Sequence, residues 1–241
     1  MTRPIQTHSG PSTSTPNKIV FELIGPSGVG KSFFSSHLLK RLSSRLSDGS
    51  RTEIPNGNHH QATPLPHWRL LELKVQELAG KDSLTVLQKT LLMQHFTFIL
   101  LQDIAMLSLS PGETVLLDEG VLHNFAGEIL CSDSSDTRAI LQSKAIVYLR
   151  PNRTETILKR VLARARAGEL RSHHIGMTHR EMLEAIEHSV EKFDRFVGLA
   201  DRYGVPSLTL AAEASTKQKT KLFEEFEGVC MGRLFRSPDH I

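Results

Sequence analysis

The glycine-rich segment at residues 25–32, GPSGVGKS, carries the clearest chemistry in this sequence. It matches the pattern G-x-x-x-x-G-K-[ST], in which glycines allow a tight turn and backbone N–H groups surround the phosphates of a nucleotide. In this pattern the lysine reaches the β- and γ-phosphates, and the last hydroxyl binds magnesium. The segment therefore predicts a site for ATP and Mg²⁺. The residues predicted to bind the nucleotide are Gly25, Pro26, Ser27, Gly28, Val29, Gly30, Lys31, Ser32 and Phe33.

An acidic pair follows the apolar run TVLL later in the chain. Asp118 comes directly after that run, and Glu119 is the next residue. A carboxylate at the carboxyl edge of a parallel sheet lies beside the phosphate loop, where it can hold the metal through water. Asp118 and Ser32 are therefore the predicted magnesium ligands. Glu119 is the predicted base that takes the proton of the acceptor.

Arginines are concentrated after the apolar run AIVYL. At about 100° per residue on a helix, Arg153, Arg160 and Arg164 share one stripe, opposite a side of apolar residues. Such a helix can pack on the domain while it presents guanidinium groups, whose forked geometry suits phosphate. The polar stretch after this helix contributes Arg171, His173 and His174. Residues 153–178 are therefore predicted to form a lid over the phosphates.

Short apolar runs alternate with longer segments of helical periodicity along the chain. Strands are predicted at residues 18–24, 114–118, 145–149 and 207–210, with a further short strand at 52–54. Helices are predicted at residues 32–46, 68–79, 84–109, 178–203 and 216–234, besides the arginine-bearing helix. This alternation is typical of an α/β fold with right-handed crossovers. We therefore expect the three-layer sandwich of a P-loop NTPase, with a parallel five-stranded sheet and helices on both faces.

The composition favours a single globular domain. The chain has 241 residues, of which 39% are hydrophobic and 23% charged. We predict one domain over residues 18–235, between tails at residues 1–17 and 236–241. Cys131 and Cys230 are too far apart in sequence to suggest a paired-thiol metal site or a disulfide framework.

Charge and hydropathy exclude several kinds of partner. The net charge of +3 is too small to favour nucleic acid or an anionic membrane. The densest apolar stretch, residues 91–107, is interrupted by polar side chains and does not predict a membrane span. Residues 1–17 lack the apolar run of a secretory signal. We therefore expect a cytoplasmic protein. Its expected partners are ATP and a small-molecule acceptor. A homodimer is possible, and the choice between monomer and homodimer stays open.

The order of these motifs resembles the P-loop nucleoside and nucleotide kinases, in particular thymidylate-kinase-like proteins, over about residues 18–210. FELIGPSGVGKS looks like their phosphate loop, and the long helix before LLDEG looks like their acceptor-side helix. YLRPNRTETILKRVLARARAGELR looks like their strand followed by a lid helix. The resemblance implies an ATP- and Mg²⁺-dependent kinase. With Lys31 from the loop motif and Glu119 from the acidic pair, the expected catalytic residues are Lys31, Glu119, Arg160 and Arg164. By that likeness, Arg160 and Arg164 are lid arginines that touch the transferred phosphoryl group.

The chain departs from the thymidylate-kinase pattern around the acceptor. Those kinases tend to have an Asp-Arg pair where this chain has Asp118 and Glu119, and an arginine in the long helix that grips the acceptor's phosphate. Here no lysine or arginine occurs between Lys89 and Arg138. The long helix offers Gln94, His95, Gln102 and Asp103 instead. Because these groups cannot neutralise a phosphate, we expect an uncharged or cationic hydroxyl acceptor, such as a nucleoside, a sugar or another metabolite.

Three alternatives stay open. If the long helix only packs in the core, the acceptor is a nucleoside monophosphate anchored by Arg69, Lys74 or Arg138. A regulatory protein that hydrolyses ATP or GTP to change partners is the second alternative, although the guanine-reading N-K-x-D pattern is missing after the strands. A binding protein with a relic loop is the third. It is disfavoured because the phosphate-loop lysine, its hydroxyl neighbour and the strand-end aspartate are all retained.

Overall fold

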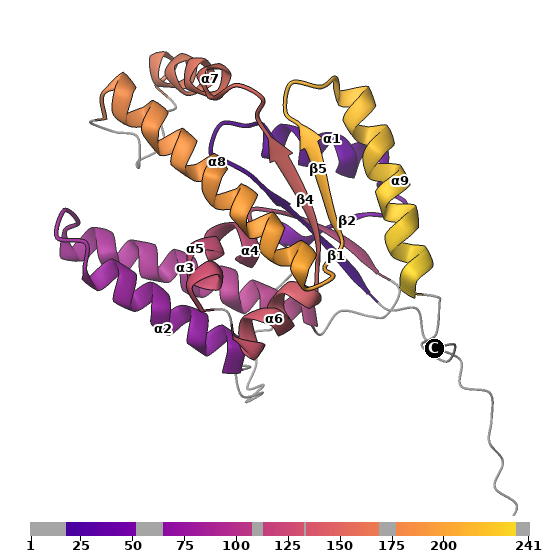
Figure 1. Ribbon diagram of the computed structural model, residues 1–241, viewed down its shortest axis with the longest axis horizontal. Coiled ribbons are helices and arrows are strands. Elements are labelled where there is room, and N and C mark those ends of the chain that lie inside the picture. Colours follow the sequence, from indigo (N-terminus) through magenta and orange to yellow (C-terminus); the bar gives the residue numbers. More distant parts are fainter. Residues whose placement is uncertain (1–17, 52–64, 108–112, 133, 169–176, 235–241) are drawn as a thin grey trace, which may run out of the picture.

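A parallel sheet forms the centre of the protein. The computed structural model describes residues 18–51, 65–107, 113–132, 134–168 and 177–234. Its described strands pair in the order β2-β3-β1-β4-β5, all parallel (Figure 1). They are β1 (Ile19–Ile24), β2 (Ser47–Asp48), β3 (Thr114–Asp118), β4 (Ala145–Arg150) and β5 (Ser207–Ala211). The long apolar runs of β1, β3 and β4 suit a parallel sheet that is covered on both faces.

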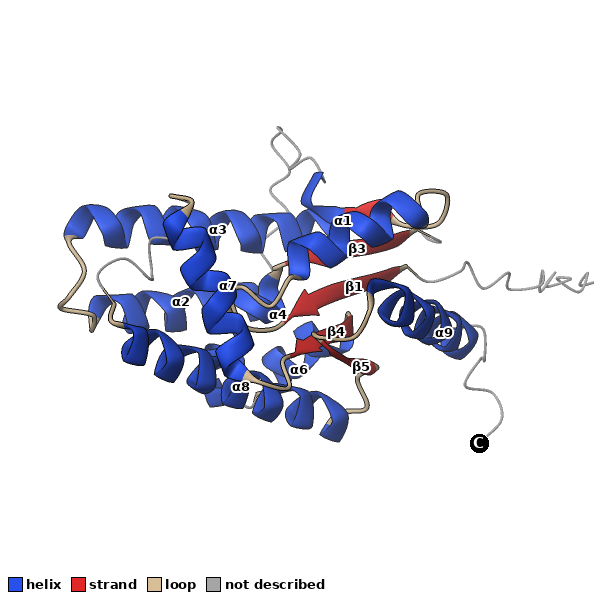
Figure 2. Cartoon of the chain, turned by 90° about the horizontal axis from the view of Figure 1, so that it is seen from above, coloured by secondary structure: helices blue, strands red, loops and turns tan. Residues whose placement is uncertain are grey.

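Helices cover both faces of this sheet (Figure 2). They are α1 (Lys31–Arg41), the 3₁₀ turn η1 (Gly49–Arg51), α2 (Leu65–Ala79), α3 (Val86–Leu107), α4 (Val121–Asn124), α5 (Ala126–Ser132), α6 (Ser135–Gln142), α7 (Thr154–Arg166), α8 (His179–Arg202) and α9 (Thr216–Leu234). Because side chains alternate along a strand, Phe21 faces α9, where it meets Phe223, while Tyr148 faces α8 and Phe193. The expected three-layer α/β sandwich is confirmed.

The strand order places one crevice at the carboxyl end of β1. The chain adds β2 and β3 on one side of β1, then β4 and β5 on the other side. The crossovers therefore leave β1 in opposite directions, which is the point where open α/β sheets bind ligands. The segment that follows β1 is residues 25–30. The sheet thus presents the glycine-rich loop at its switch point.

Helix α8 is long and strongly amphipathic, and it lies across the face of the sheet opposite to α9 (Figure 1). A reciprocal cap starts it: the Glu181 backbone N–H donates to the Thr178 hydroxyl at 3.3 Å, and the Thr178 N–H donates to the Glu181 carboxylate at 2.7 Å. This capping box satisfies two donors that a helix start leaves without partners. Phe193 and Phe196 of α8 are completely buried. The core therefore fixes which side of α8 faces the rest of the domain.

The predicted elements and the observed ones agree best for the long segments. The first helix ends at Arg41 rather than at residue 46, although Leu42 and Leu46 beyond it are still buried. The second strand is β2, whereas the strand predicted at residues 52–54 lies outside the described residues, as do both predicted tails. The helices α4, α5 and α6 were not predicted. Across the described segments, no helix is long and apolar enough to cross a membrane.

Candidate active site

The loop between β1 and α1 is shaped by glycine. Gly25 has φ 141°, and a Cβ atom there would lie 2.6 Å from the carbonyl oxygen of Leu149 in β4. Gly28 has φ 84°, and a Cβ atom there would lie 3.0 Å from Val161 in α7. Only glycine adopts these left-handed conformations freely and also leaves this space. The loop is therefore held between β4 and α7, and it leads directly into the first turn of α1, whose N–H groups favour an anion.

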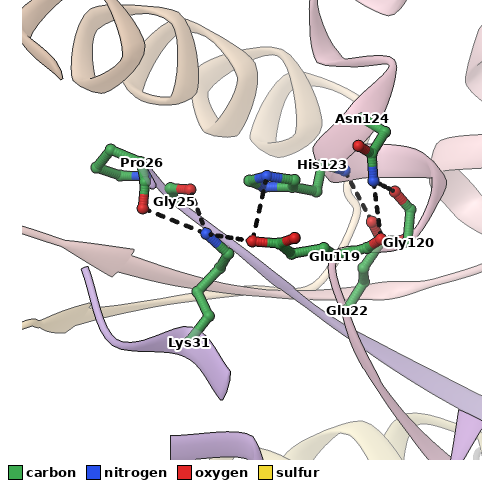
Figure 3. A network of polar contacts seen from close by, with 8 residues as sticks. All are labelled: Glu22, Gly25, Pro26, Lys31, Glu119, Gly120, His123 and Asn124. Atoms are coloured by element: carbon green, nitrogen blue, oxygen red, sulfur yellow. Dashed lines mark hydrogen bonds and ion pairs between the residues drawn. The ribbon is translucent and has the colours of Figure 1, made fainter. Parts of the chain in front are cut away.

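Lys31 is the first residue of α1 and is buried. Its ammonium group donates to the carbonyl oxygens of Gly25 at 2.8 Å and Pro26 at 3.2 Å. It also pairs with Glu119 Oε1 at 3.2 Å (Figure 3). A buried cation is stable only when it is paired and hydrogen-bonded. These contacts fix the positive charge between the glycine-rich loop and the end of β3.

The acidic pair lies on the strand beside the loop. Asp118 ends β3 and is in register with Leu23 of β1, so its carboxylate comes from the strand next to the one that carries the loop. Glu119 follows with φ 68°, in the left-handed region that non-glycine residues avoid. The Asn124 side-chain amide donates to the carbonyl oxygens of Glu119 at 2.8 Å and Gly120 at 2.9 Å and so holds this turn (Figure 3). Strain of this kind, on the order of 1–3 kcal/mol, persists mainly at functional positions.

The predicted magnesium ligands fit a hard cation that is shared with substrate phosphates. Asp118 lies at the strand end, and Ser32 lies exposed on the first turn of α1. Mg²⁺ usually keeps several waters and takes one or two protein oxygens besides phosphates. Within the described ranges, no group of three His, Cys, Asp or Glu side chains could hold a metal. Phe33, beside Ser32, is 69% exposed.

Helix α7 lies directly over the phosphate loop. Ile157 and Val161 are buried in the same apolar cluster as Val29 of the loop. Arg160, which the sequence predicts to be catalytic, donates from Nη1 to the Val29 carbonyl oxygen at 3.2 Å. Arg164 is exposed one turn later. Arg153 directly precedes α7, whereas Arg171, His173 and His174 of the predicted lid lie outside the described residues.

A buried carboxyl group lies beneath the acidic turn. Glu22 of β1 is completely buried, and its Oε1 accepts a hydrogen bond from the His123 backbone N–H at 2.8 Å (Figure 3). Its Oε2 has no hydrogen-bond partner among the described residues. A Cβ atom at Gly120 would lie 2.7 Å from this carboxyl group, so position 120 needs glycine. Burial raises the pKa of Glu22 to about 7, against the attraction of Lys144 and the hydrogen bond from His123.

This pKa predicts a pH-dependent loss of stability. Between pH 4.5 and about 7 the unfolded chain releases the Glu22 proton before the folded protein does, so unfolding becomes more favourable as the pH rises. Above about pH 7 the loss is complete, at about 3 kcal/mol. We expect Glu22→Gln to gain stability relative to wild type between pH 5 and pH 8, measured by urea denaturation. Glu225→Gln, an exposed substitution of the same kind, is the control. A pH-independent difference between Glu22→Gln and wild type would contradict the raised pKa.

A cavity opens beside the acidic turn that carries Asp118 and Glu119. It has a volume of about 510 Å³, which falls in the range of ligand pockets, and lies between α2, α4, α5 and α8. Asn124, which holds the Glu119 turn, is one of its lining residues. Charged and polar side chains that line it are Lys74, Glu77, Glu128, His188, Ser189 and Lys192. Through Asn124, the cavity therefore adjoins the turn that carries Glu119.

The prediction that α3 presents polar groups to the acceptor is wrong for two of its residues. Asp103 is buried against His67, whose Nε2 lies 2.9 Å away, and against Lys144. The Gln102 amide donates to the Gly49 carbonyl oxygen at 2.8 Å. No α3 residue lines the cavity in the described structure. These side chains balance buried charge and hydrogen bonds in the core, so the scarcity of cations along α3 does not define the charge of an acceptor.

The three alternative anchors named from the sequence lie in different places. Lys74 lines the cavity. Arg69 is exposed and pairs with Glu72 in the same helix. Arg138 is exposed, with its guanidinium carbon 5.2 Å from the centre of the Tyr203 ring. Only Lys74 of these three is therefore close to the candidate acceptor cavity.

The fold is an α/β sheet with a glycine-rich loop after its central strand, at the position where open parallel sheets bind ligands. No protein-family model and no curated protein matches this chain. Similar solved structures include deoxyadenosine kinase from M. mycoides with bound dATP, at 17% identity and a TM-score of 0.48, covering 87% of this chain and 99% of that chain. A shikimate kinase from Bacteroides thetaiotaomicron has 14% identity and a TM-score of 0.46, covering 87% and 98%. A gluconokinase from Sinorhizobium meliloti has 12% identity and a TM-score of 0.44, covering 92% and 97%.

Proposed function

We propose that this protein transfers the γ-phosphoryl group of ATP to a hydroxyl group of a small molecule. The observation that carries this proposal is the position of Lys31, whose ammonium group lies between the loop carbonyls and Glu119. A phosphate in the loop would meet this cation on one side and the carboxylates of the acidic turn on the other. This arrangement supports the proposal, because a donor phosphate bound there would lie next to a base.

The reaction needs few protein groups beyond positioning and charge. The acceptor oxygen attacks the γ-phosphorus, a P–O bond forms, and the bond to the β-phosphate oxygen breaks, leaving ADP. Glu119 takes the proton of the attacking hydroxyl group. Lys31 and the loop N–H groups stabilise the charge on the phosphoryl oxygens, and Arg160 and Arg164 add to this when the lid region closes. Ser32 and Asp118 hold Mg²⁺, which neutralises charge on the β- and γ-phosphates when bound.

The cavity beside Glu119 supports transfer to an acceptor over a regulatory NTPase. A switch protein needs only water as the acceptor, whereas a volume of about 510 Å³ suits a small molecule. The cavity reaches the acidic turn through Asn124. An acceptor seated there would present a hydroxyl group near Glu119. We therefore favour a phosphotransferase.

A screen for products tests this function. The protein is incubated with ATP, Mg²⁺ and a panel of nucleosides, nucleoside monophosphates, sugars and sugar acids, and products are identified by mass spectrometry. We expect at least one member to gain one phosphoryl group, and Lys31→Met to abolish that product. Release of inorganic phosphate from ATP at the same rate with and without every acceptor would instead favour the regulatory NTPase.

A further inference from the structure

Two lysines line the cavity, and their surroundings differ. Lys74 of α2 is buried and pairs with Glu77 at 2.9 Å and with Glu128. Its ammonium group also lies 4.6 Å from the centre of the Phe96 ring and 5.3 Å from that of Phe125. Because two carboxyl groups and two rings already surround it, Lys74 has its charge compensated within the protein.

The ammonium group of Lys192 in α8 is not paired with carboxyl groups in this way. Its ammonium group lies 4.8 Å from the centre of the Phe193 ring, and no carboxylate pairs with it in the described part of the chain. The residue is half-buried and lines the cavity with Ala185, His188 and Ser189, which recur at helical spacing on one face of α8. Burial and repulsion from Lys74 lower the pKa of Lys192, and attraction from Glu128 and Glu77 offsets only part of this. The cavity therefore holds a cation that has no carboxylate at ion-pair distance among the described residues.

The position of Lys192 favours a role in binding an acceptor over a role in an ion pair within the protein. A half-buried charge without a counter-ion is unfavourable, and an anion that enters the cavity removes part of that cost. Glu77 and Glu128 at the same cavity can accept hydrogen bonds from hydroxyl groups of a bound molecule. The site thus has separate groups for an anion and for hydroxyls.

We propose that the acceptor carries an anionic group, a carboxylate or a phosphate monoester, and that Lys192 binds this group in the cavity. The proposal rests on the phosphotransferase function proposed above and adds the chemical class of the acceptor. It reverses the uncharged acceptor expected from the sequence. The reason is that α2 and α8, rather than α3, supply the cations of the cavity.

Matched pairs of acceptors test this inference. The probes are the four deoxynucleosides against their 5′-monophosphates, and glucose against gluconate, so that phosphate and carboxylate are distinguished. We expect wild type to prefer the anionic member of at least one pair by tenfold or more in kcat/KM. Lys192→Gln should lower kcat/KM for that anionic member at least tenfold, and Lys192→Arg should retain the preference. Arg195→Gln, which removes an exposed cation from the same helix, is the control and should have no such effect.

The outcomes separate this inference from the proposed function. Products from neutral members alone would overturn the anionic acceptor and leave the phosphotransferase intact. An equal loss for both members of a pair in Lys192→Gln, or a weaker affinity for ATP, would assign Lys192 to the donor phosphates and overturn the inference. If no member of any pair is phosphorylated, the phosphotransferase function fails, and the inference fails with it.

Discussion

Lys31→Ala is expected to lower kcat/KM for phosphoryl transfer at least a hundredfold, about 3 kcal/mol of transition-state stabilisation. Lys31 places a buried positive charge between the loop carbonyls and Glu119, and a methyl group cannot replace that charge. The charge that develops on the phosphoryl oxygens would then lack its nearest cation. The measurement is steady-state kinetics with an acceptor found in the screen.

The control for this substitution removes a cation from the same helix. Lys40 is exposed in the last turn of α1, so Lys40→Ala should leave kcat/KM unchanged within about twofold. Lys31→Met keeps the length of the side chain and separates loss of charge from loss of packing. Thermal unfolding checks that each variant is folded. A folded Lys31→Ala variant that retains more than a tenth of wild-type kcat/KM would remove Lys31 from the transition state.

Glu119→Gln is expected to lower kcat by about a hundredfold or more at saturating ATP and Mg²⁺, because an amide cannot take the acceptor's proton. The substitution keeps a carbonyl oxygen close to Lys31, and the backbone turn held by Asn124 does not depend on the carboxylate. Binding of ATP should therefore change little. The pH profile of kcat should also lose its acidic limb, because that limb reports the protonation of the base.

Asp118→Asn should give a different result from Glu119→Gln, because Asp118 is the proposed metal ligand and Glu119 is the proposed base. We expect it to raise the Mg²⁺ concentration needed for half-maximal activity, with partial recovery of kcat at high Mg²⁺. Glu119→Gln should not recover in this way. An unchanged Mg²⁺ titration for Asp118→Asn would exclude Asp118 from the metal site, and an intact acidic limb in Glu119→Gln would assign Glu119 to positioning of Lys31. The exposed substitution Glu225→Gln serves as the control for both.

Local sequence patterns predicted the parts of the site that local geometry determines. The loop at residues 25–32 needs particular residues at particular positions, because glycine conformations and the start of α1 are properties of a short segment. Strand β3 and helix α9 were predicted at the residues where they occur, since a bounded apolar run and a long periodic segment give strong signals. Glu22 was visible as the one polar residue in an apolar strand, although its role beneath the acidic turn was not.

The acceptor cavity could not be predicted, because distant segments form it. Lys192 follows the pattern of a solvent-facing lysine on an amphipathic helix. Only the packing of α8 against α5, together with α2 at the same cavity, gives it a place in the cavity lining. The helices α4 and α5 are short, so they have too few turns for periodicity to show. The polar residues of α3 suggested a binding surface, yet the carboxylate of Asp103 pairs with His67 and Lys144 in the core. Sequence spacing along one helix does not reveal partners from other elements.

The packing of α7 on the phosphate loop has a consequence for the rate of turnover. Ile157 and Val161 are almost completely buried, so lifting the whole helix would expose both, at about 1.5–3 kcal/mol each. The helix continues past Val161 to Arg166 and is followed by Gly168, whose φ is 76°. Within α7, motion that spares these contacts is confined to the residues beyond Val161. If the proposed kinase releases ADP by lifting α7, substitutions that tighten this packing would stabilise the fold and slow the release, so that the same apolar contacts couple folding stability to turnover.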